Sequence, residues 1–378
     1  MKLVLSVEAL SANLTGIGRY TWELAQRLPA HGLLENVLFY RNGRWIKEPR
    51  TLLLPESEPA KVAKSTAKPK WRFRLKQPRW LRDGRNWAAC RGRVFHGPNF
   101  FLPACAEGGV ATVHDLSVFK YPETHPADRI RQFERDFKAS MGRAAHLITD
   151  SAATRQEVMD FLGWPGEKIT AVPLGVSSQF APVPPDVLAP VLSQYGLTVN
   201  RYTLCVSTLE PRKKEAHLLR AYQCLPQSLR EQYPLVLIGG HGWLSEALHQ
   251  EIDRLAAQGW LHYLGFLPEA DLPALYAGAR AFVYPSVYEG FGLPVLEAMA
   301  SGVPVVASVF TSMPEITQGA ALLLNPDDID ALARGIHTSL CNEDWRANAI
   351  DSGLAVAQTY SWDRCIEQTV AVYQKINR

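Results

Sequence analysis

Short apolar runs alternate with longer helical patterns along the 378 residues. In the first half the predicted strands are KLVLSV, NVLFY, VFHG, GVATVHD, HLITD and ITAVPLG, and in the second half YTLCVST, PLVLIGG, LHYLGF, AFVYPS, VPVVAS and AALLL. These runs are continuously apolar rather than alternating, which indicates strands buried on both faces, as in parallel sheets. Strand–helix alternation in both halves predicts an α/β protein with two Rossmann-like, doubly wound domains.

The segment SSQFAPVPPDVLAPVLSQYGL is rich in Pro and Ser and is predicted to be the linker between the two domains. We expect Pro184 and Pro185 to end any regular element. The predicted domains are therefore residues 1–180 and 181–358, and WDRCIEQTVAVYQKI predicts a helix within residues 359–378. In open α/β sheets, ligands bind beyond the carboxyl ends of the strands, so candidate site residues should follow predicted strands.

Composition indicates a soluble globular protein, with 47% hydrophobic and 20% charged residues. No apolar run reaches the roughly 18 residues of a membrane-spanning helix. The N-terminal MKLVLSVEAL predicts a first strand rather than a signal peptide. The six cysteines lack metal-ligand spacing, so we expect reduced thiols in a cytoplasmic protein.

The net charge of +3 is unevenly distributed. Residues 61–93 hold twelve Lys or Arg and one acidic residue, while the remaining chain has 28 basic and 36 acidic residues. The basic stretch also contains Trp71, Trp80 and Trp87. This mixture suits contact with an anionic membrane surface, although a solvated loop with a helix inside it fits equally well. The patch is local and no nucleic-acid motif accompanies it, which disfavours nucleic acid as a partner.

Two candidate groups lie in the first half. Gly16 and Gly18 precede a predicted helix, where backbone N–H groups can approach a phosphate or a sugar, although an ordinary turn is an alternative. The third glycine of the dinucleotide fingerprint is missing, which disfavours a dehydrogenase. His114 and Asp115 follow a predicted buried strand, as either a structural pair or a pair facing the ligand.

Three cations follow the first strand of the second half. Arg212, Lys213 and Lys214 come directly after Pro211, which suits the first turn of a helix. Cations at the positive end of a helix are unfavourable without an anion. A bound diphosphate would resolve this conflict, and three solvated side chains are the alternative.

The stretch YEGFGLPVLEAMASG predicts a loop and then a helix, with Pro294 in its first turn and Gly302 at its end. Free N–H groups at the start of this helix suit a phosphate or a sugar hydroxyl. The residues that present them are Phe291, Gly292 and Leu293. Glu289 and Glu297 would repel a diphosphate but suit sugar and ribose hydroxyls. Glu297 is alternatively a helix-start acid favoured by the macrodipole.

Together these residues resemble a known family. The pair Glu289 and Glu297, separated by seven residues that include GFGLP and preceded by PRKK and GFLP, is similar to the retaining GT-B glycosyltransferases of family 4 (GT4). TGIGRYTWELAQRL, HDLSVFKYPETHP, ITDSAATRQEV and VPLGV resemble the branch of bacterial O-antigen mannosyl- and rhamnosyltransferases. The resemblance implies two domains facing a central cleft, an acceptor-binding N-terminal domain, a donor-binding C-terminal domain and a last helix that crosses back to the N-terminal domain.

The resemblance also implies roles for individual residues. Lys213 and Arg212 would bind the donor diphosphate and stabilise its developing charge. Glu289 would hold hydroxyls of the donor sugar. His114, with Asp115, would lie on the acceptor side and face the transferred sugar. The donor-binding positions would be Gly16, Gly18, Thr208, Phe266, Leu267, Phe291, Gly292, Leu293 and Glu297, with Phe266 and Leu267 at the base and Glu297 at the ribose.

The chain departs from the family pattern at two positions. Ser207 stands where many relatives carry an arginine six residues before the diphosphate lysine, which puts more weight on Arg212. Lys214 stands where the branch often has Asn. No Asp-x-Asp suits Mg²⁺, and PDDID around Asp327 predicts a helix-start acid cluster, so we expect transfer without metal or cofactor.

The branch resemblance implies transfer of mannose or rhamnose from a GDP-sugar to a lipid-linked or polysaccharide acceptor of the cell surface. We expect a cytoplasmic protein held peripherally at the inner face of the membrane through residues 61–93. UDP- and dTDP-sugars are alternative donors. A nucleotide-sugar 2-epimerase is an alternative enzyme, a phosphorylase would need a longer chain, and a non-catalytic sugar-nucleotide-binding scaffold is the alternative of another class.

Overall fold

The computed structural model describes residues 1–14, 16–54, 79–240, 242 and 245–377. Its strands are β1 (Lys2–Ser6), β2 (Asn36–Arg41), β3 (Arg44–Ile46), β4 (Val94–Gly97), β5 (Gly109–Val113), β6 (Ala144–Thr149), β7 (Ile169–Ala171), β8 (Thr203–Val206), β9 (Leu235–Ile238), β10 (Leu261–Tyr263), β11 (Ala281–Tyr284), β12 (Val305–Ser308) and β13 (Leu322–Leu324). Its α-helices are α1 (Gly16–Arg27), α2 (Arg79–Cys90), α3 (Ser117–Lys120), α4 (Ala127–Met141), α5 (Ala152–Leu162), α6 (Pro185–Gln194), α7 (Glu215–Gln223), α8 (Gln227–Gln232), α9 (Glu246–Ala256), α10 (Leu272–Ala277), α11 (Leu293–Ala300), α12 (Met313–Thr317), α13 (Ile329–Cys341), α14 (Glu343–Ala357) and α15 (Trp362–Ile376). Short 3₁₀ helices are η1 (Leu28–Ala30), η2 (Pro49–Leu53), η3 (Pro122–Thr124), η4 (Gly166–Lys168) and η5 (Pro211–Lys213).

The chain divides into two compact units. The first comprises Met1–Val113, Asp136–Ile148 and Thr369–Arg378, and the second comprises His114–Arg135 and Thr149–Gln368. This division follows spatial contacts rather than one cut in the chain. The domain limits at residues 180 and 358 therefore stay predictions.

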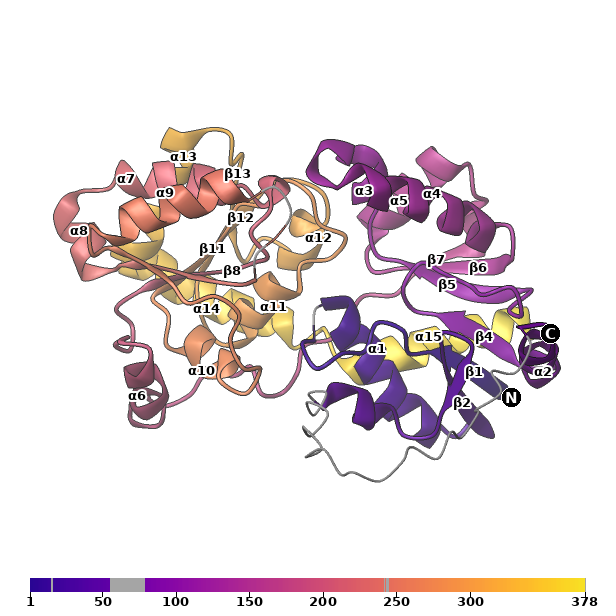
Figure 1. Ribbon diagram of the computed structural model, residues 1–378. Helices are drawn as coiled ribbons and strands as arrows, with labels where there is room; N and C mark the ends of the chain where they lie inside the picture. The colour runs from indigo at the N-terminus through magenta and orange to yellow at the C-terminus, as the bar shows by residue number, and fades with distance from the viewer. Residues whose placement is uncertain (15, 55–78, 241, 243–244, 378) are drawn as a thin grey trace, which may run out of the picture. The chain divides into compact units, whose positions relative to one another are not determined.

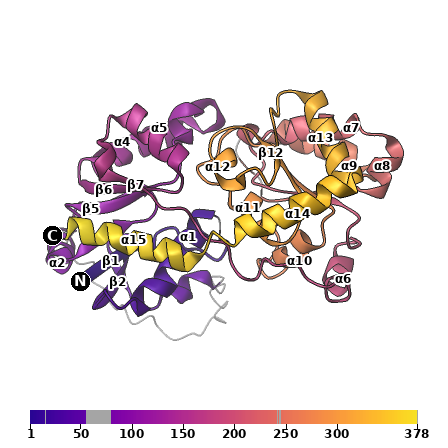
Figure 2. The ribbon, with the colours of Figure 1, turned by 180° about the vertical axis from the view of Figure 1, so that it is seen from behind.

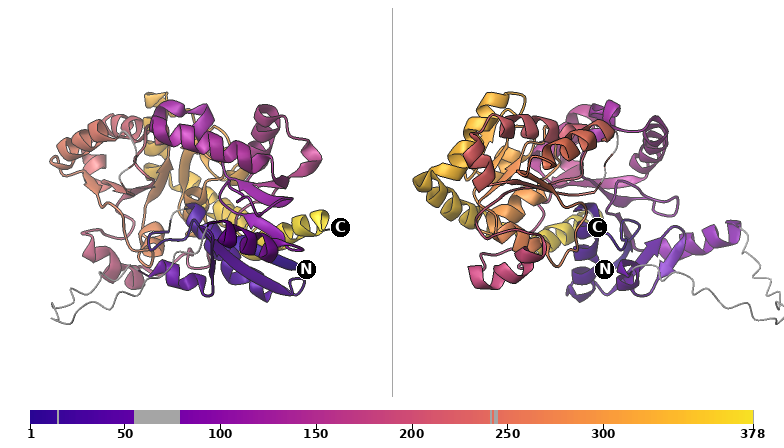
Figure 3. Two further views of the ribbon diagram at one scale, coloured as in Figure 1. Left: turned by 45° about the vertical axis from the view of Figure 1, so that its right-hand side comes forward. Right: turned by 60° about the vertical axis from the view of Figure 1, so that its left-hand side comes forward.

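The first sheet has the strand order β3-β2-β1-β4-β5-β6-β7, and its strands β1 to β5 belong to the first unit (Figure 1). Strands β2, β1, β4 and β5 pair in parallel, as the continuous apolar runs predicted. Helix α1 contacts this sheet through Tyr20, whose hydroxyl lies 3.1 Å from the Thr112 hydroxyl. The last turns of α15 contact it through Tyr373, whose hydroxyl lies 2.6 Å from Nδ1 of His96. Both ends of the chain belong to this unit, and Figure 3 marks them near each other in both of its views.

Strand β3 was not predicted. It pairs antiparallel with β2, and Asn42 and Gly43 form the turn with φ of 48° and 79°. Two consecutive residues with positive φ are typical of a type I′ hairpin turn, for which Asn-Gly is the preferred dipeptide. The pair Asn42–Gly43 was therefore the missed signal, because the RWI strand, with three residues, is too short to form an apolar run.

The second unit is built on an all-parallel sheet with the order β10-β9-β8-β11-β12-β13. Helices α7, α9 and α13 cover one face and α10, α11 and α14 the other (Figures 1 and 2). Buried Leu218, Leu235, Ile252, Val283 and Ile336 belong to the core on the first of these faces. The two doubly wound parallel sheets confirm the predicted fold class.

The interpretation of Pro184 and Pro185 as terminators was wrong. Pro184 caps helix α6 and Pro185 is its first residue. Proline is favoured in the first helical turn, because N–H groups there have no acceptor within the helix and the lack of an N–H costs no hydrogen bond. Leu188 and Leu192 are buried, so this part of the predicted linker is a packed helix.

No helix among the described residues is long and apolar enough to cross a membrane. Residues 61–78 and the side chains of residues 79–83 lie outside what the structure describes, and with them Trp71 and the side chain of Trp80. Trp87 is described, is exposed, and lies 6.0 Å below the guanidinium of Arg91. The membrane hypothesis for residues 61–93 stays a prediction.

Candidate active site

A cluster of buried charges lies at the point where the strand order of the second sheet reverses. Lys213 follows β8 and Glu289 follows β11, and these strands are neighbours although β9 and β10 come between them in the chain. Ligands of open α/β sheets bind at such a switch point. Lys213 forms an ion pair with Glu289, donates a hydrogen bond of 3.0 Å to the Tyr284 hydroxyl, and is only 8% exposed.

Arg212 joins the same cluster from the preceding position of η5. It donates hydrogen bonds of 2.7 Å to the Tyr288 carbonyl and 3.2 Å to the Glu210 carboxylate. Its Nη1 lies 3.7 Å from Oε2 of Glu289. The backbone is tied in too, because Val287 N–H donates to the Arg212 carbonyl at 3.0 Å. Arg212 therefore fastens the loop after β8 to the loop after β11.

The cluster fixes the ionisation of its members. Burial alone would raise the pKa of Glu289, but the charges of Lys213 and Arg212 hold this pKa below its ordinary value. Burial, followed by the Glu289 charge, raises the pKa of Tyr284 well above its ordinary value. Glu289 is thus an ionised acceptor, and the Tyr284 hydroxyl keeps its proton and donates to it at 2.9 Å. Glu289 pairs with the two cations that were predicted to bind a diphosphate.

His114 lies directly behind the loop that carries Glu289. A side chain on Gly290 would place its Cβ 1.7 Å from the His114 carbonyl oxygen, so only glycine allows this close approach. Ser151 and Thr154 donate hydrogen bonds of 2.6 and 3.0 Å to the Gly290 carbonyl. The structure therefore brings together the predicted His114 and the predicted glutamate loop within the second unit.

Asp150 orients the His114 ring, with its Oδ2 2.6 Å from Nδ1. Burial raises the pKa of Asp150, and the neighbouring His114 opposes this rise. A carboxylate on Nδ1 fixes the ring and directs Nε2 as the working nitrogen. Asp115 instead stabilises the start of α3, because its Oδ1 accepts a hydrogen bond of 2.8 Å from Ser117 N–H.

The N-terminus of α11 presents unused amides beside the cluster. Among the described residues, no group accepts a hydrogen bond from the N–H groups of Phe291, Gly292 or Leu293. Gly292 has φ of 115°, and a Cβ there would lie 2.3 Å from Cε of Met313. Ser312 holds the loop, because its hydroxyl donates a hydrogen bond of 2.6 Å to the Phe291 carbonyl. These amides can receive an oxygen of a ligand.

The remaining predicted donor residues also follow strands of the second sheet. Glu297 lies in α11, is half-buried, and raises the pKa of Tyr276, for which burial is the larger cause. Thr208 is exposed after β8. Phe266 is 54% exposed after β10, as an apolar surface for a base should be, whereas Leu267 is buried.

Gly16 and Gly18 do not precede the helix, as was predicted, but lie within it. Helix α1 begins at Gly16, so both glycines lie in its first turn and do not form a loop before it. Gly16 is exposed and Gly18 is buried. The buried face of the helix begins at Gly18 and Tyr20. Both residues belong to the first unit, and their donor contact stays a prediction.

The positions that depart from the family pattern have clear contacts. Ser207 donates a hydrogen bond of 2.6 Å to the buried carboxyl of Glu215. Lys214 has φ of 58° and pairs with Asp327 at 2.8 Å, so its charge points away from Glu289 and toward another partner. Asp328 caps α13 by accepting from Ala331 N–H, which confirms PDDID as a helix-start cluster.

Sequence reasoning missed several members of the site. These are Tyr284, Tyr288, Glu210, Asp150 and Thr311. Tyr284 and Tyr288 flank the end of a predicted strand in VYPSVYEG, and Asp150 ends ITD. Polar residues at the ends of predicted parallel strands were a usable signal for these three.

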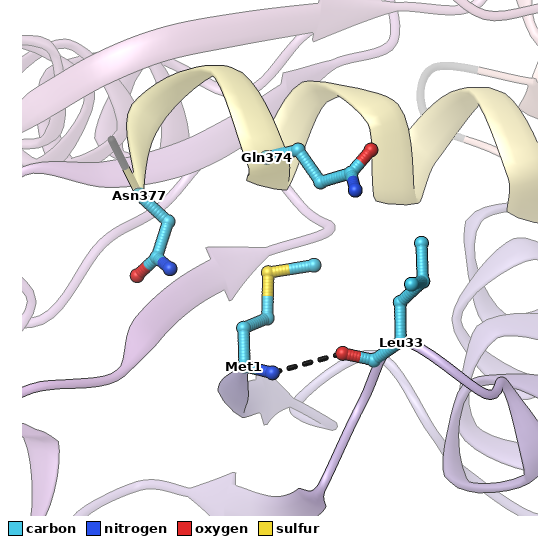
Figure 4. Close-up of a pocket in the computed structure, with 4 residues that line it drawn as sticks. All are labelled: Met1, Leu33, Gln374 and Asn377. Carbon is cyan, nitrogen blue, oxygen red and sulfur yellow. Dashed lines mark hydrogen bonds between the residues drawn. The ribbon is translucent and has the colours of Figure 1, made fainter.

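The first unit has a separate pocket of about 380 Å³ between β1 and the end of α15 (Figure 4). Its lining residues are Met1, Leu33, Gln374 and Asn377. The Met1 amine donates a hydrogen bond of 2.9 Å to the Leu33 carbonyl. None of the predicted site residues lines this pocket, and we assign it no ligand.

Comparison with known proteins identifies the family and the fold. Family models described as Glycosyltransferase Family 4 and Glycosyl transferases group 1 match residues 14–180 and 197–355. The O-antigen chain mannosyltransferase B of Escherichia coli is 40% identical over 99% of this chain and 100% of its own length. The serotype-specific mannosyltransferase WbdA of Escherichia coli is 31% identical over 67% of this chain, but that match spans only 32% of WbdA. The crystal structure of HepE from Anabaena in complex with UDP and glucose has a TM-score of 0.73 at 21% identity, over 99% of both chains.

The two family models, the full-length relative and the two parallel sheets are mutually consistent. The chain belongs to glycosyltransferase family 4 and has the GT-B fold.

Proposed function

We propose that the protein is a retaining hexosyltransferase that moves mannose from GDP-mannose to a hydroxyl of a lipid-linked or polysaccharide acceptor in O-antigen or related surface-glycan synthesis. The full-length match to an O-antigen chain mannosyltransferase supports the sugar and the acceptor class. GDP-rhamnose and UDP- or dTDP-sugars are the alternative donors. The observation that carries the proposal is the Lys213–Arg212–Glu289 cluster beside the unused amides of α11.

The cluster suits departure of a diphosphate. Lys213 and Arg212 bind the diphosphate oxygens and stabilise their growing negative charge as the glycosidic bond breaks. Glu289 exchanges its ion pair for hydroxyls of the sugar, which the amides at Phe291 to Leu293 also contact. The acceptor oxygen bonds to the anomeric carbon on the face that the diphosphate leaves, and the acceptor proton passes to the leaving phosphate oxygen. His114 lies beside the transferred sugar, and Glu297 holds the ribose.

The same cations support transfer without a metal ion. Mg²⁺ commonly neutralises a diphosphate in sites that lack sufficient protein charge. Lys213 and Arg212 supply two positive charges here once Glu289 has exchanged its ion pair for the sugar hydroxyls. We therefore propose metal-independent transfer with no cofactor besides the nucleotide-sugar substrate.

A transfer assay with the full chain tests these points together. We expect GDP-mannose to raise the melting temperature more than UDP- or dTDP-sugars, because a ligand that binds only the folded state stabilises it. We also expect an α-linked mannosyl product that forms at the same rate with excess EDTA. Binding without turnover of any donor would favour the scaffold alternative, and release of a modified sugar without an acceptor would favour an epimerase.

We further propose that residues 61–93 hold the protein at the anionic inner face of the cytoplasmic membrane. Twelve basic residues and interleaved Trp support this, since each Lys or Arg near such a surface adds about 1 kcal/mol of attraction. Reversing the charges between Lys70 and Arg85 should abolish flotation with anionic liposomes at low salt. Equal flotation of the wild type and the charge-reversed variant would favour the interpretation of residues 61–93 as a solvated loop.

A further inference from the structure

The second unit contains a pocket of about 510 Å³ that borders the charged cluster and shares Arg212 with it. Its wall comes from α3, η3, α5 and η5 and from the loops after β11, β12 and β13. This volume is within the range of about 300–1,000 Å³ typical of small-molecule sites. We infer that this pocket, which we call the Tyr121 pocket, binds a neutral oligosaccharide portion of the acceptor, away from the reacting hydroxyl.

Aromatic side chains give the Tyr121 pocket the apolar surface that a sugar ring requires. The rings of Tyr121 and Tyr288 have centroids 5.0 Å apart and are tilted by 46°. Phe310 is 37% exposed and lines the same pocket. Aromatic groups combined with a few fixed polar groups are typical of sites for ligands with both apolar and polar faces.

The charges of the pocket favour a neutral ligand over an anion. Its cationic and acidic lining residues balance, and they are Lys120, Arg212 and Lys214 against Glu123, Glu157 and Asp327. Lys120 pairs with Glu157 at 2.9 Å and Lys214 with Asp327 at 2.8 Å. A phosphate group would be repelled by these carboxylates. Hydroxyl groups can donate to the carboxylates and accept from the ammonium groups without separating either pair.

The polar groups are also held in fixed positions. Glu157 accepts a hydrogen bond of 2.6 Å from the Tyr288 hydroxyl while it pairs with Lys120. The same Tyr288 hydroxyl accepts from Leu116 N–H at 2.9 Å. Groups that are already oriented lose little entropy when they bind a ligand, which is the usual source of affinity in such sites.

The pocket and the donor cluster share atoms. Arg212 lines the pocket and contacts Glu289, and Thr311, another lining residue, accepts a hydrogen bond of 3.1 Å from Glu289 N–H. Tyr288 directly precedes Glu289. An oligosaccharide in the pocket therefore lies next to the loop that we propose holds the donor sugar. The assignment to the acceptor rests on the proposed function, whereas carbohydrate binding itself does not.

Binding measured without any donor tests the pocket alone. We expect α-linked mannotriose to bind the wild-type chain in titration calorimetry, and Tyr121→Ala and Phe310→Ala each to weaken binding about tenfold, the loss of one aromatic contact. Tyr121→Phe, which keeps the ring, should bind within about twofold of wild type. Phe161→Ala is the matched control, since Phe161 is an exposed aromatic of α5 outside the pocket. GDP should bind all of these variants equally.

Equal mannotriose binding by wild type, Tyr121→Ala and Phe310→Ala would overturn the inference. Binding of inorganic pyrophosphate that Tyr121→Ala or Phe310→Ala weakens would also overturn it, because it would indicate an anion site in the pocket. In the transfer assay, Tyr121→Ala should raise the acceptor KM about tenfold with an unchanged donor KM. An unchanged acceptor KM alongside lost mannotriose binding would refute the acceptor assignment. If wild type transfers no sugar while mannotriose binding depends on Tyr121, the proposed function fails and the carbohydrate site stands.

Discussion

Lys213→Met should lower kcat about 100-fold or more while leaving the protein folded. The methionine retains most of the buried aliphatic stem, so packing around Tyr284 is largely kept. What is lost is the charge that stabilises the departing diphosphate, and the loss of a single such group typically costs about two to three decades in rate. Steady-state transfer with a saturating donor, and circular dichroism of the purified variant, measure the two parts of this expectation.

Arg220→Met is the matched control for Lys213→Met. Arg220 lies in α7, the helix that follows the same turn, and is exposed. Its replacement removes an equal charge close in sequence but outside the cluster, so kcat should stay within about twofold, because a distant exposed charge is screened by solvent. A kcat for Lys213→Met close to that of the control would refute the role of Lys213 in the chemistry.

The fold was largely predictable because each buried strand carries its own local signal. VFHG became β4 over its whole length, and AFVYPS contains β11. Two of the failures have clear local causes. Strand β3 has no apolar run and depends on the Asn42–Gly43 turn, and α6 begins with a proline that also occurs at linker positions.

The cluster could be predicted as a set of residues but not as a set of contacts. Lys213 and Glu289 are 76 positions apart and meet only because β11 pairs with β8 instead of extending the sheet beyond β10. Sequence patterns predict strands but do not specify that order. The ion pair between Lys213 and Glu289 is consequently the main finding that sequence could not supply. The two charges were predicted to bind different parts of the ligand, whereas in the structure they form an ion pair.

Because of this ion pair, Glu289→Gln should slow transfer but strengthen the binding of GDP. Transfer should fall about 100-fold or more, because a neutral amide is a weaker acceptor for the sugar hydroxyls than a carboxylate. GDP should nevertheless bind about fivefold more tightly, because the diphosphate no longer competes with Glu289 for Lys213 and Arg212. Calorimetry with GDP and steady-state transfer give the two values. Weaker GDP binding would contradict the competition between Glu289 and the diphosphate.

The stability of the same variant should depend on pH in a defined direction. Removing one partner of a buried ion pair costs about 3 kcal/mol, so Glu289→Gln should unfold more easily than wild type at pH 7. The pKa of Glu289 is held below its ordinary value of 4.5 in the folded protein, so its contribution is complete above pH 4.5 and is lost as the pH falls through the lowered pKa. The difference in unfolding free energy between wild type and variant should therefore shrink in acid. Glu367→Gln, at an exposed position of α15, should show no such difference at either pH. A wild-type advantage that persists unchanged in acid would mean that packing, and not the charge of Glu289, holds the two loops together.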